Sequence, residues 1–121
     1  MSPFPAPLRV VVIEDSADDA ELLRFALEDG GLCVECLRVF TEPALREALA
    51  GFSANVVLSD LNIPGFSGER ALEVVRETAP GLPFVFVTGW EGESPALEGA
   101  DARVLKESLD TLPALLGRLL A

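Results

Sequence analysis

Short apolar runs alternate with longer segments of helical periodicity along the chain. In the run Arg9–Ile13, β-branched residues follow one another without a polar break, as in a strand buried on both faces. Ser16 has the side chain of a helix N-cap, and acidic residues follow it in the first turn, where they are favourable. Leu23 and Leu27 then share one helical face, which Leu22 widens. The pattern predicts a buried strand followed by an amphipathic helix.

The same unit recurs to the end of the chain. Further strands are predicted over residues 33–40, 55–59, 84–87 and 103–105, and further helices after Thr41, around residues 71–79 and over Leu109–Leu120. Residues 91–99 hold at most a very short helix, with Ser94 as its cap and Pro95 as its first residue. This order predicts an α/β sandwich, with a parallel sheet between helices on both faces. Residues 1–7 are expected to form a flexible proline-rich lead-in, and residues 8–121 one domain.

Polar side chains follow four of the predicted strands directly. They are Glu14 and Asp15 after the first strand, Asp60 after the third, Thr88 after the fourth and Lys106 after the fifth. Since ligands of such sheets bind outside the carboxyl ends of the strands, these side chains are expected at one site. A single polar residue there is often only the point where a strand leaves the core. The convergence of acids, a hydroxyl and an amine favours a functional site.

The chemistry of these side chains is that of phosphoryl transfer. Three carboxylates at one edge repel one another, and a hard divalent cation such as Mg²⁺ relieves that repulsion. Asp60 is then placed to attack phosphorus as a nucleophile and form an aspartyl phosphate. Lys106 would bind one phosphoryl oxygen as a point charge, and Thr88 would donate its hydroxyl to another. We therefore predict a phosphoacceptor rather than an enzyme, with at most slow self-phosphorylation and dephosphorylation.

Four motifs surround these residues, in residues 10–15, 58–68, 87–89 and 104–106. Together they resemble the receiver domain of bacterial two-component response regulators, over about residues 8–120. Within the second motif, Pro64 and Gly68 fall four and eight positions after Asp60, as in that family. The resemblance implies a doubly wound, flavodoxin-like sheet of five parallel strands, here with the fourth helix shortened.

The resemblance also implies how the site would work. Asp60 would be phosphorylated by a histidine kinase or a phosphotransfer protein, with Mg²⁺ as cofactor. Asp15, Asp60 and the backbone carbonyl of Asn62 would ligate the ion. Glu14 would act through a bound water. The chain would then be a bacterial, cytoplasmic phosphoprotein of signal transduction.

The sequence departs from that family on one side of the site. Arg103 stands three positions before Lys106, where the family has an aromatic residue that turns inward as the threonine moves. Glu107 replaces the usual proline after the lysine, and Trp90 stands where family members place a residue overlooking the phosphoryl group. Only 18 positions separate Thr88 from Lys106, about one helical turn fewer than in most receivers. Phosphorylation is expected to be preserved, whereas the usual signalling relay is not.

Composition narrows the classes of partner. The net charge of −11 repels nucleic acid and anionic membranes, so neither is expected as a direct partner. No apolar run approaches the ~20 residues of a membrane span. Cys33 and Cys36 lack the two further ligands that a zinc site needs, and they lie in a strand-like run. Two reduced cysteines in a cytoplasmic protein are predicted.

Several alternatives share parts of this pattern. A flavodoxin-like electron carrier needs a phosphate loop after the first strand, where this chain has acids instead. A haloacid-dehalogenase-type phosphatase needs a second acid two residues after Asp60, where Asn62 stands. A degenerate receiver, acting as an interaction module with little phosphorylation, stays open as the alternative function.

The predicted last helix has more apolar residues than one sheet face requires. Its leucines are Leu109, Leu112, Leu116 and Leu119, at spacings of three and four, with Leu115 and Leu120 beside them. Such a wide stripe either packs entirely in the core or leaves part exposed as an interface. A homodimer through this helix is therefore one predicted partnership.

Overall fold

The computed structural model describes residues 7–89, 92 and 95–120 of the 121-residue chain. Its elements in chain order are β1 (Leu8–Ile13), α1 (Ala17–Asp29), β2 (Val34–Val39), α2 (Glu42–Gly51), β3 (Val56–Ser59), α3 (Gly68–Thr78), β4 (Phe84–Thr88), α4 (Pro95–Gly99), β5 (Ala102–Leu105), the 3-10 helix η1 (Lys106–Thr111) and α5 (Leu112–Leu120). This is the predicted order of strands and helices, including a very short α4. None of the helices in the described part of the chain has the length and apolar character to cross a membrane.

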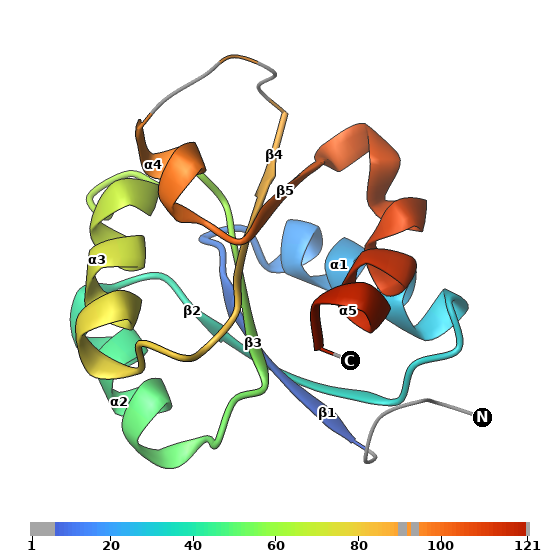
Figure 1. Ribbon diagram of the computed structural model, residues 1–121, viewed down its shortest axis with the longest axis horizontal. Helices are drawn as coiled ribbons and strands as arrows, with labels where there is room; N and C mark the ends of the chain where they lie inside the picture. The colour runs from blue at the N-terminus through green and yellow to red at the C-terminus, as the bar shows by residue number, and fades with distance from the viewer. Residues whose placement is uncertain (1–6, 90–91, 93–94, 121) are drawn as a thin grey trace.

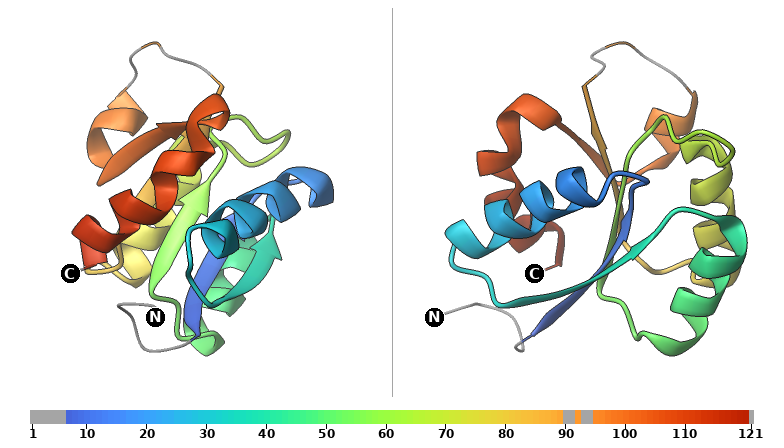
Figure 2. Two further views of the ribbon diagram at one scale, coloured as in Figure 1. Left: turned by 90° about the vertical axis from the view of Figure 1, so that its right-hand side faces the viewer. Right: turned by 180° about the vertical axis from the view of Figure 1, so that it is seen from behind.

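The sheet is parallel throughout, with strand order β2-β1-β3-β4-β5. Helices α1 and α5 cover one face and α2, α3 and α4 the other (Figures 1 and 2). The chain moves outward from β1 to β2 and then returns past β1 to β3. The order therefore reverses between β1 and β3, and this is the switch point where such folds bind ligands. The predicted doubly wound fold is confirmed.

Each central strand contributes to two cores, one on each side of the sheet. Val11 and Ile13 of β1 pack with α2 and α3, while Val10 and Val12 pack with α1 and α5. Burial on both faces explains why the strand is apolar at every one of these positions. Phe84 packs on the α2–α3 side of the sheet. Its ring meets that of Phe86, also on β4, edge to face, with ring centroids 4.9 Å apart.

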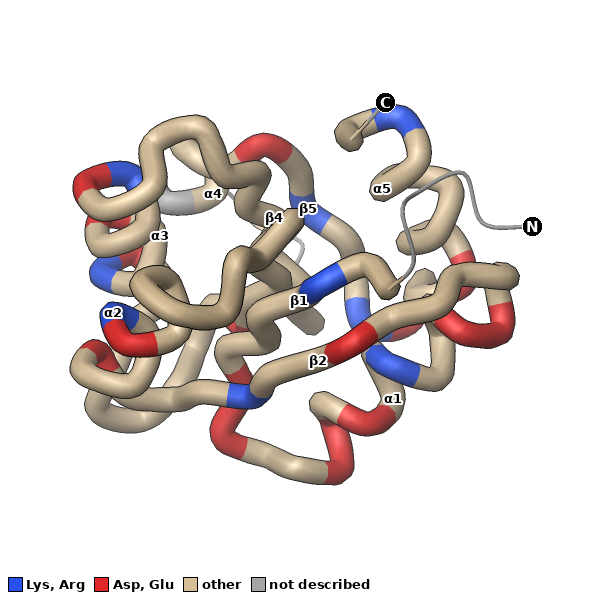
Figure 3. Tube along the Cα trace, turned by 90° about the horizontal axis from the view of Figure 1, so that it is seen from below, with Lys and Arg blue, Asp and Glu red and all other residues tan. Residues whose placement is uncertain are grey.

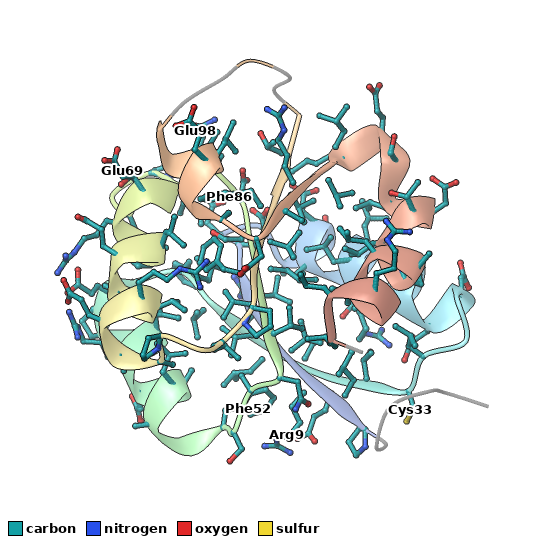
Figure 4. The ribbon with its side chains drawn as sticks, viewed as in Figure 1. Arg9, Cys33, Phe52, Glu69, Phe86 and Glu98 are labelled. Carbon is teal, nitrogen blue, oxygen red and sulfur yellow. The ribbon has the colours of Figure 1, made fainter. Side chains whose placement is uncertain are left out.

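The turn between Asp60 and α3 is tightly packed. Gly68 donates its backbone N–H to the carbonyl of Leu61 at 3.0 Å. A Cβ at Gly68 would lie 2.7 Å from the ring of Phe86 and 2.8 Å from that carbonyl, so only glycine fits without displacing them. Phe86 lies between the sheet and the helices (Figure 4). Its packing fixes the loop that follows Asp60.

Two sequence-based predictions about packing were wrong. Leu22 does not widen the buried face of α1, because its side chain is 55% exposed. The last α-helix begins at Leu112 rather than Leu109. The 3-10 helix η1 precedes α5, and the backbone of Ser108 within η1 is not helical. Pro113 suits the first turn of α5, where no N–H partner is needed.

The N-caps predicted at Ser16 and Thr41 are confirmed. Their side-chain oxygens accept backbone N–H groups from the first turns of α1 and α2, both at 3.2 Å. Ser94, predicted to cap α4, lies outside the described residues. Cys33 and Cys36 are free, and burial raises the pKa of Cys36 to about 11, which leaves its thiol protonated at neutral pH.

Candidate functional site

The carboxyl ends of β1, β3, β4 and β5 bring the predicted residues to one edge of the sheet. Asp60 follows β3, and its N–H donates to the carbonyl of Ile13 at the end of β1, 2.9 Å away. Thr88 ends β4 opposite Leu105 of β5 and is buried. Lys106 follows directly. The structure thus brings together residues that lie far apart in the sequence.

Lys106 is at the centre of this cluster. Its Nζ lies 3.2 Å from Oδ2 of Asp60, 3.7 Å from Oε2 of Glu14 and 3.5 Å from Oδ2 of Asp19. Burial, the largest effect, lowers the pKa of Lys106, but the charges of these carboxylates together raise it above its ordinary value. Lys106 is also the only lysine of the chain. It is therefore a fully charged ammonium shared among acids.

A small cavity of about 50 Å³ adjoins this ammonium. Its lining combines the charged groups with apolar side chains of α1, β4 and η1: Glu14, Asp19, Leu22, Leu23, Asp60, Val87, Lys106 and Leu109. Apolar walls lower the local dielectric, so charges here interact more strongly than on an open surface.

Glu14 is the most buried acid of the site, with 3% of its side chain exposed. Burial is the main cause that raises the pKa of Glu14 to about 7. A hydrogen bond with Asp15 and the charge of Asp60 raise it further, while the N–H of Ser16, 3.1 Å from Oε1, and the charge of Lys106 lower it. A nearby cation would stabilise the ionised form of such a carboxyl and so lower its pKa.

Asp60 is held at both carboxylate oxygens. Oδ1 accepts the backbone N–H of Asn62 at 3.2 Å, and Oδ2 faces Lys106. The hydroxyl of Ser59 donates to the carbonyl of Asp60 at 2.8 Å. The side chain is 13% exposed, so one edge of this oriented carboxylate remains open to solvent.

The donor set can be tested for Mg²⁺. Carboxylate oxygens are the ligands this ion prefers, and Glu14, Asp15 and Asp60 supply them at one edge. Within the described residues, however, no three acidic, histidine or cysteine side chains converge closely enough to hold an ion as placed. The positive charge beside Glu14 and Asp60 is the ammonium of Lys106. The residue types fit Mg²⁺, but these carboxylates, including the exposed Asp15, would have to come closer together to hold the ion.

Sequence reasoning missed two charged residues of this edge. Asp19 is one of the acidic residues in the first turn of α1, and its place in the sequence does not indicate a contact with Lys106. Arg38 of β2 places Nη1 3.3 Å from the carbonyl of Glu14 and 3.2 Å from that of Asp15, and its guanidinium lies 5.0 Å from the centre of the Phe40 ring. The pairing of Arg38 with Val12 explains its reach, but that register appears only once the sheet is known.

Two of the departures in the sequence, Arg103 and Glu107, lie on β5 and η1 close to Lys106 in the chain. Arg103 pairs with Phe86 across β5 and β4, and Nη1 donates to the carbonyl of Gly92 at 2.5 Å. Its side chain is half-buried. Glu107 is exposed in η1. Trp90, expected to overlook the phosphoryl group, lies outside the described residues.

The charge distribution is uneven around the fold. Acidic segments gather along α1 and the connection that precedes it, as the view from below shows (Figure 3). At the amino end of β1, Arg9 pairs with Glu35 at 2.9 Å and stacks on the ring of Phe52, which lies beside it (Figure 4). The acidic edge and this basic residue are at opposite ends of β1.

A family comparison matches residues 10–107 to the response regulator receiver domain. Among curated relatives, the C4-dicarboxylate transport transcriptional regulatory protein DctD of Rhizobium meliloti is 34% identical over 89 residues, covering 71% of this chain and 18% of DctD. The DNA-binding transcriptional regulator NtrC of Escherichia coli is 29% identical over 104 residues, covering 86% of this chain and 21% of NtrC. The chain thus spans about a fifth of the length of these relatives.

Solved structures show the same fold. A CheY-like receiver domain from Methanospirillum hungatei superposes with a TM-score of 0.77 at 24% identity, covering 93% of this chain and 92% of the other. The receiver domain of NarL from Mycobacterium tuberculosis superposes with a TM-score of 0.76 at 22% identity, covering 96% and 98%. At this level of identity, the similarity concerns the fold alone.

Proposed function

Since the chain belongs to the response regulator receiver domain family of two-component systems, we propose that Asp60 accepts a phosphoryl group from a histidine kinase or a phosphotransfer protein, with Mg²⁺ as cofactor. The observation that carries the proposal is the contact between Asp60 and Lys106, 3.2 Å apart beside the buried Glu14. This transfer needs a nucleophilic carboxylate, an ammonium and an acid whose ionised form is stabilised by a cation.

The transfer follows from the positions of these groups. A carboxylate oxygen of Asp60 attacks phosphorus, the P–N bond of the donor phosphohistidine breaks, and the leaving imidazole takes up a proton. Lys106 moves from Oδ2 of Asp60 to a phosphoryl oxygen, which removes its pairing with the nucleophile and neutralises the transferred charge. The hydroxyl of Thr88 donates to a second oxygen.

The ion would be held by Asp15, Asp60 and the carbonyl of Asn62, with Glu14 acting through water. When bound, Mg²⁺ neutralises charge on the phosphoryl oxygens during transfer. This function makes the protein a phosphoacceptor rather than an enzyme, and we place it in the bacterial cytoplasm. Absence of direct nucleic-acid binding remains a prediction, based on the net charge of −11.

Phosphorylation by a small donor tests the proposal. The wild type, Asp60→Asn and Asp110→Asn are incubated with Mg²⁺ and acetyl phosphate, and intact mass is followed over time. Asp110 is an exposed aspartate of η1 and serves as the matched control. We expect one phosphoryl group on the wild type and on Asp110→Asn, and none on Asp60→Asn. Phosphorylation of Asp60→Asn at the wild-type rate would show that another residue is the acceptor. No phosphorylation of the wild type would favour the alternative of a degenerate receiver.

The metal is tested separately, without phosphoryl donor. Mg²⁺ at millimolar concentrations should raise the melting temperature, because it binds the folded state and relieves repulsion among carboxylates. Asp15→Ala should abolish this stabilisation, and Glu14→Ala should weaken it. A melting temperature unchanged by Mg²⁺ in the wild type would count against the metal site.

A further inference from the structure

Asp19 brings an additional acid to Lys106 from outside the strand ends. Its Oδ2 lies 3.5 Å from Nζ, closer than the nearest oxygen of Glu14 at 3.7 Å. The three acidic partners of Lys106 come from different parts of the fold, namely the ends of β3 and β1 and the first turn of α1. The ammonium of Lys106 is therefore attracted both to Asp60 and to Asp19 on α1.

The N-cap of α1 fixes Asp19 in this position. The hydroxyl of Ser16 accepts the backbone N–H of Asp19 at 3.2 Å, which sets the orientation of the first turn. Asp18 precedes it in the same turn and is exposed. Among the described side chains, the ion-pair partners of Lys106 are Asp60, Glu14 and Asp19, and Asp18 is not one of them. Both aspartates interact favourably with the dipole of α1, but of the two only Asp19 contacts the ammonium of Lys106.

The two kinds of partner respond differently when a phosphoryl group arrives. Asp60 becomes the phosphorylated residue, and Lys106 must then face a group that carries nearly two negative charges. Asp19 keeps its own charge and stays on α1. It competes with the phosphoryl oxygens for the ammonium, and its carboxylate repels them across the same small cavity.

We propose that Asp19 is a positioning residue that holds Lys106 toward α1 in the unphosphorylated protein and opposes its transfer to a phosphoryl group. This rests on the proposed function of Asp60 as the phosphoacceptor. Asp19 would thus set how readily the site accepts a phosphoryl group, in a direction opposite to that of the acids that ligate the metal.

Beryllofluoride, a phosphoryl mimic, provides the first test. Its affinity for Asp19→Asn and Asp18→Asn is measured by titration in saturating Mg²⁺, and Mg²⁺ affinity is measured without fluoride. The two variants lose the same charge from the same helical turn. We expect Asp19→Asn to bind beryllofluoride about three- to ten-fold more tightly than the wild type, and Asp18→Asn to change it less than two-fold. Mg²⁺ alone should bind Asp19→Asn slightly more weakly, because the edge has lost negative charge. This opposite response of anion and cation would not arise from a merely structural role.

The ammonium itself provides the second test, without metal or mimic. Since Lys106 is the only lysine, its side-chain nitrogen gives a unique signal by NMR. Asp19→Asn should make this ammonium more mobile, and Asp18→Asn should not. Equal mobility in the two variants, or equal beryllofluoride affinity, would overturn the role of Asp19. A wild type that binds no beryllofluoride would instead refute the proposed function, and the mobility would still show whether Asp19 holds the lysine.

Discussion

Nζ of Lys106 lies 3.2 Å from Oδ2 of Asp60, although the two residues are 46 positions apart in the sequence. The ammonium thus lies among the carboxylates that a divalent ion would need. On the proposed function, Lys106 and Mg²⁺ would compete for the same negative charge in the unphosphorylated protein and would cooperate only after a phosphoryl group has arrived.

Replacement of Lys106 should therefore separate metal binding from phosphorylation. We expect Lys106→Met to bind Mg²⁺ about two- to five-fold more tightly, since a competing charge is removed. Phosphorylation by acetyl phosphate should fall at least about ten-fold, because no ammonium neutralises the phosphoryl oxygens. Calorimetry and intact mass measure the two effects. Lys106→Arg, which keeps the charge, should not strengthen Mg²⁺ binding. Weaker Mg²⁺ binding by Lys106→Met would contradict the competition.

Stability should depend on pH through Glu14. Its pKa is about 7 in the folded protein against an ordinary value of 4.5, so the folded state binds more protons than the unfolded state between these values. The free energy of unfolding should then fall as pH rises from 4.5 through 7, by about 1–3 kcal/mol. Glu14→Gln should remove this fall and be more stable than the wild type at pH 8 without metal.

Urea unfolding between pH 5 and pH 8, in the presence of a chelator, measures this dependence. Glu47→Gln is the control, because Glu47 is exposed on α2, away from the site. The neighbouring charges of Asp15, Asp60 and Lys106 remain in both variants. An equal slope in Glu14→Gln and Glu47→Gln would show that another group causes the fall.

The sequence allowed prediction of those features that depend on strand ends and chain order. Glu14, Asp60 and Lys106 converge because each directly follows a strand of one parallel sheet, and that relationship needs no knowledge of side-chain packing. Asp19 could not be assigned in this way. Its contact with Lys106 depends on how α1 and η1 pack across the edge of the sheet. An acid in the first turn of a capped helix is also favourable by itself, so its presence there does not indicate a functional role.

Packing also explains the errors. Leu22 matches the helical period of the buried face, yet α1 turns it toward the cavity beside Lys106 instead of the core. The contact of Arg38 with the carbonyls of Glu14 and Asp15 depends on the register between β1 and β2, which periodicity does not determine.

Arg38 should stabilise the turn that carries Glu14 and Asp15, the acids proposed to bind Mg²⁺. Its Nη1 contacts the carbonyls of Glu14 and Asp15. If charge alone mattered, Arg38→Met would strengthen Mg²⁺ binding by removing repulsion. We expect the reverse, a loss of about two- to five-fold in both Arg38→Met and Arg38→Lys, because lysine lacks the planar guanidinium that holds two carbonyls. Calorimetry measures it, and Arg118→Met, exposed on α5, controls for net charge. Tighter Mg²⁺ binding by Arg38→Met than by the wild type would disprove this stabilising role of Arg38.

Arg103 should not act as the inward-turning aromatic residue does in relatives. Its guanidinium is always protonated, and burial without a partner would cost several kcal/mol. We expect it to keep its contact with Gly92 when beryllofluoride binds, as a crystal structure of that complex would show. Arg103→Ala should speed amide exchange around Gly92 while leaving beryllofluoride affinity within about two-fold of the wild type. A complex with the guanidinium buried behind Thr88 would contradict this prediction.

The leucines of α5 should divide into core and surface positions. Leu112 and Leu116 are fully buried against α1 and the sheet, while Leu119 is only half-buried. Leu116→Glu places a charge in the core and should lower the free energy of unfolding by about 3–5 kcal/mol. Leu119→Glu should lower it by less than half as much. Urea unfolding measures both, and equal losses would show that the half-buried position is also core.

The same helix is the predicted dimer surface, through the leucines that the core does not fully cover. The net charge of −11 opposes self-association, so dimerisation requires a compensating apolar contact. We expect sedimentation at tens of micromolar to detect a dimer more readily in raised salt, since salt screens the repulsion among the acids, and the measurement is repeated with beryllofluoride. Leu119→Glu should abolish the dimer without unfolding the domain, whereas Ala114→Glu, exposed on the opposite side of the helix, should not. A wild type that stays monomeric under all these conditions would assign the α5 leucines to the core alone.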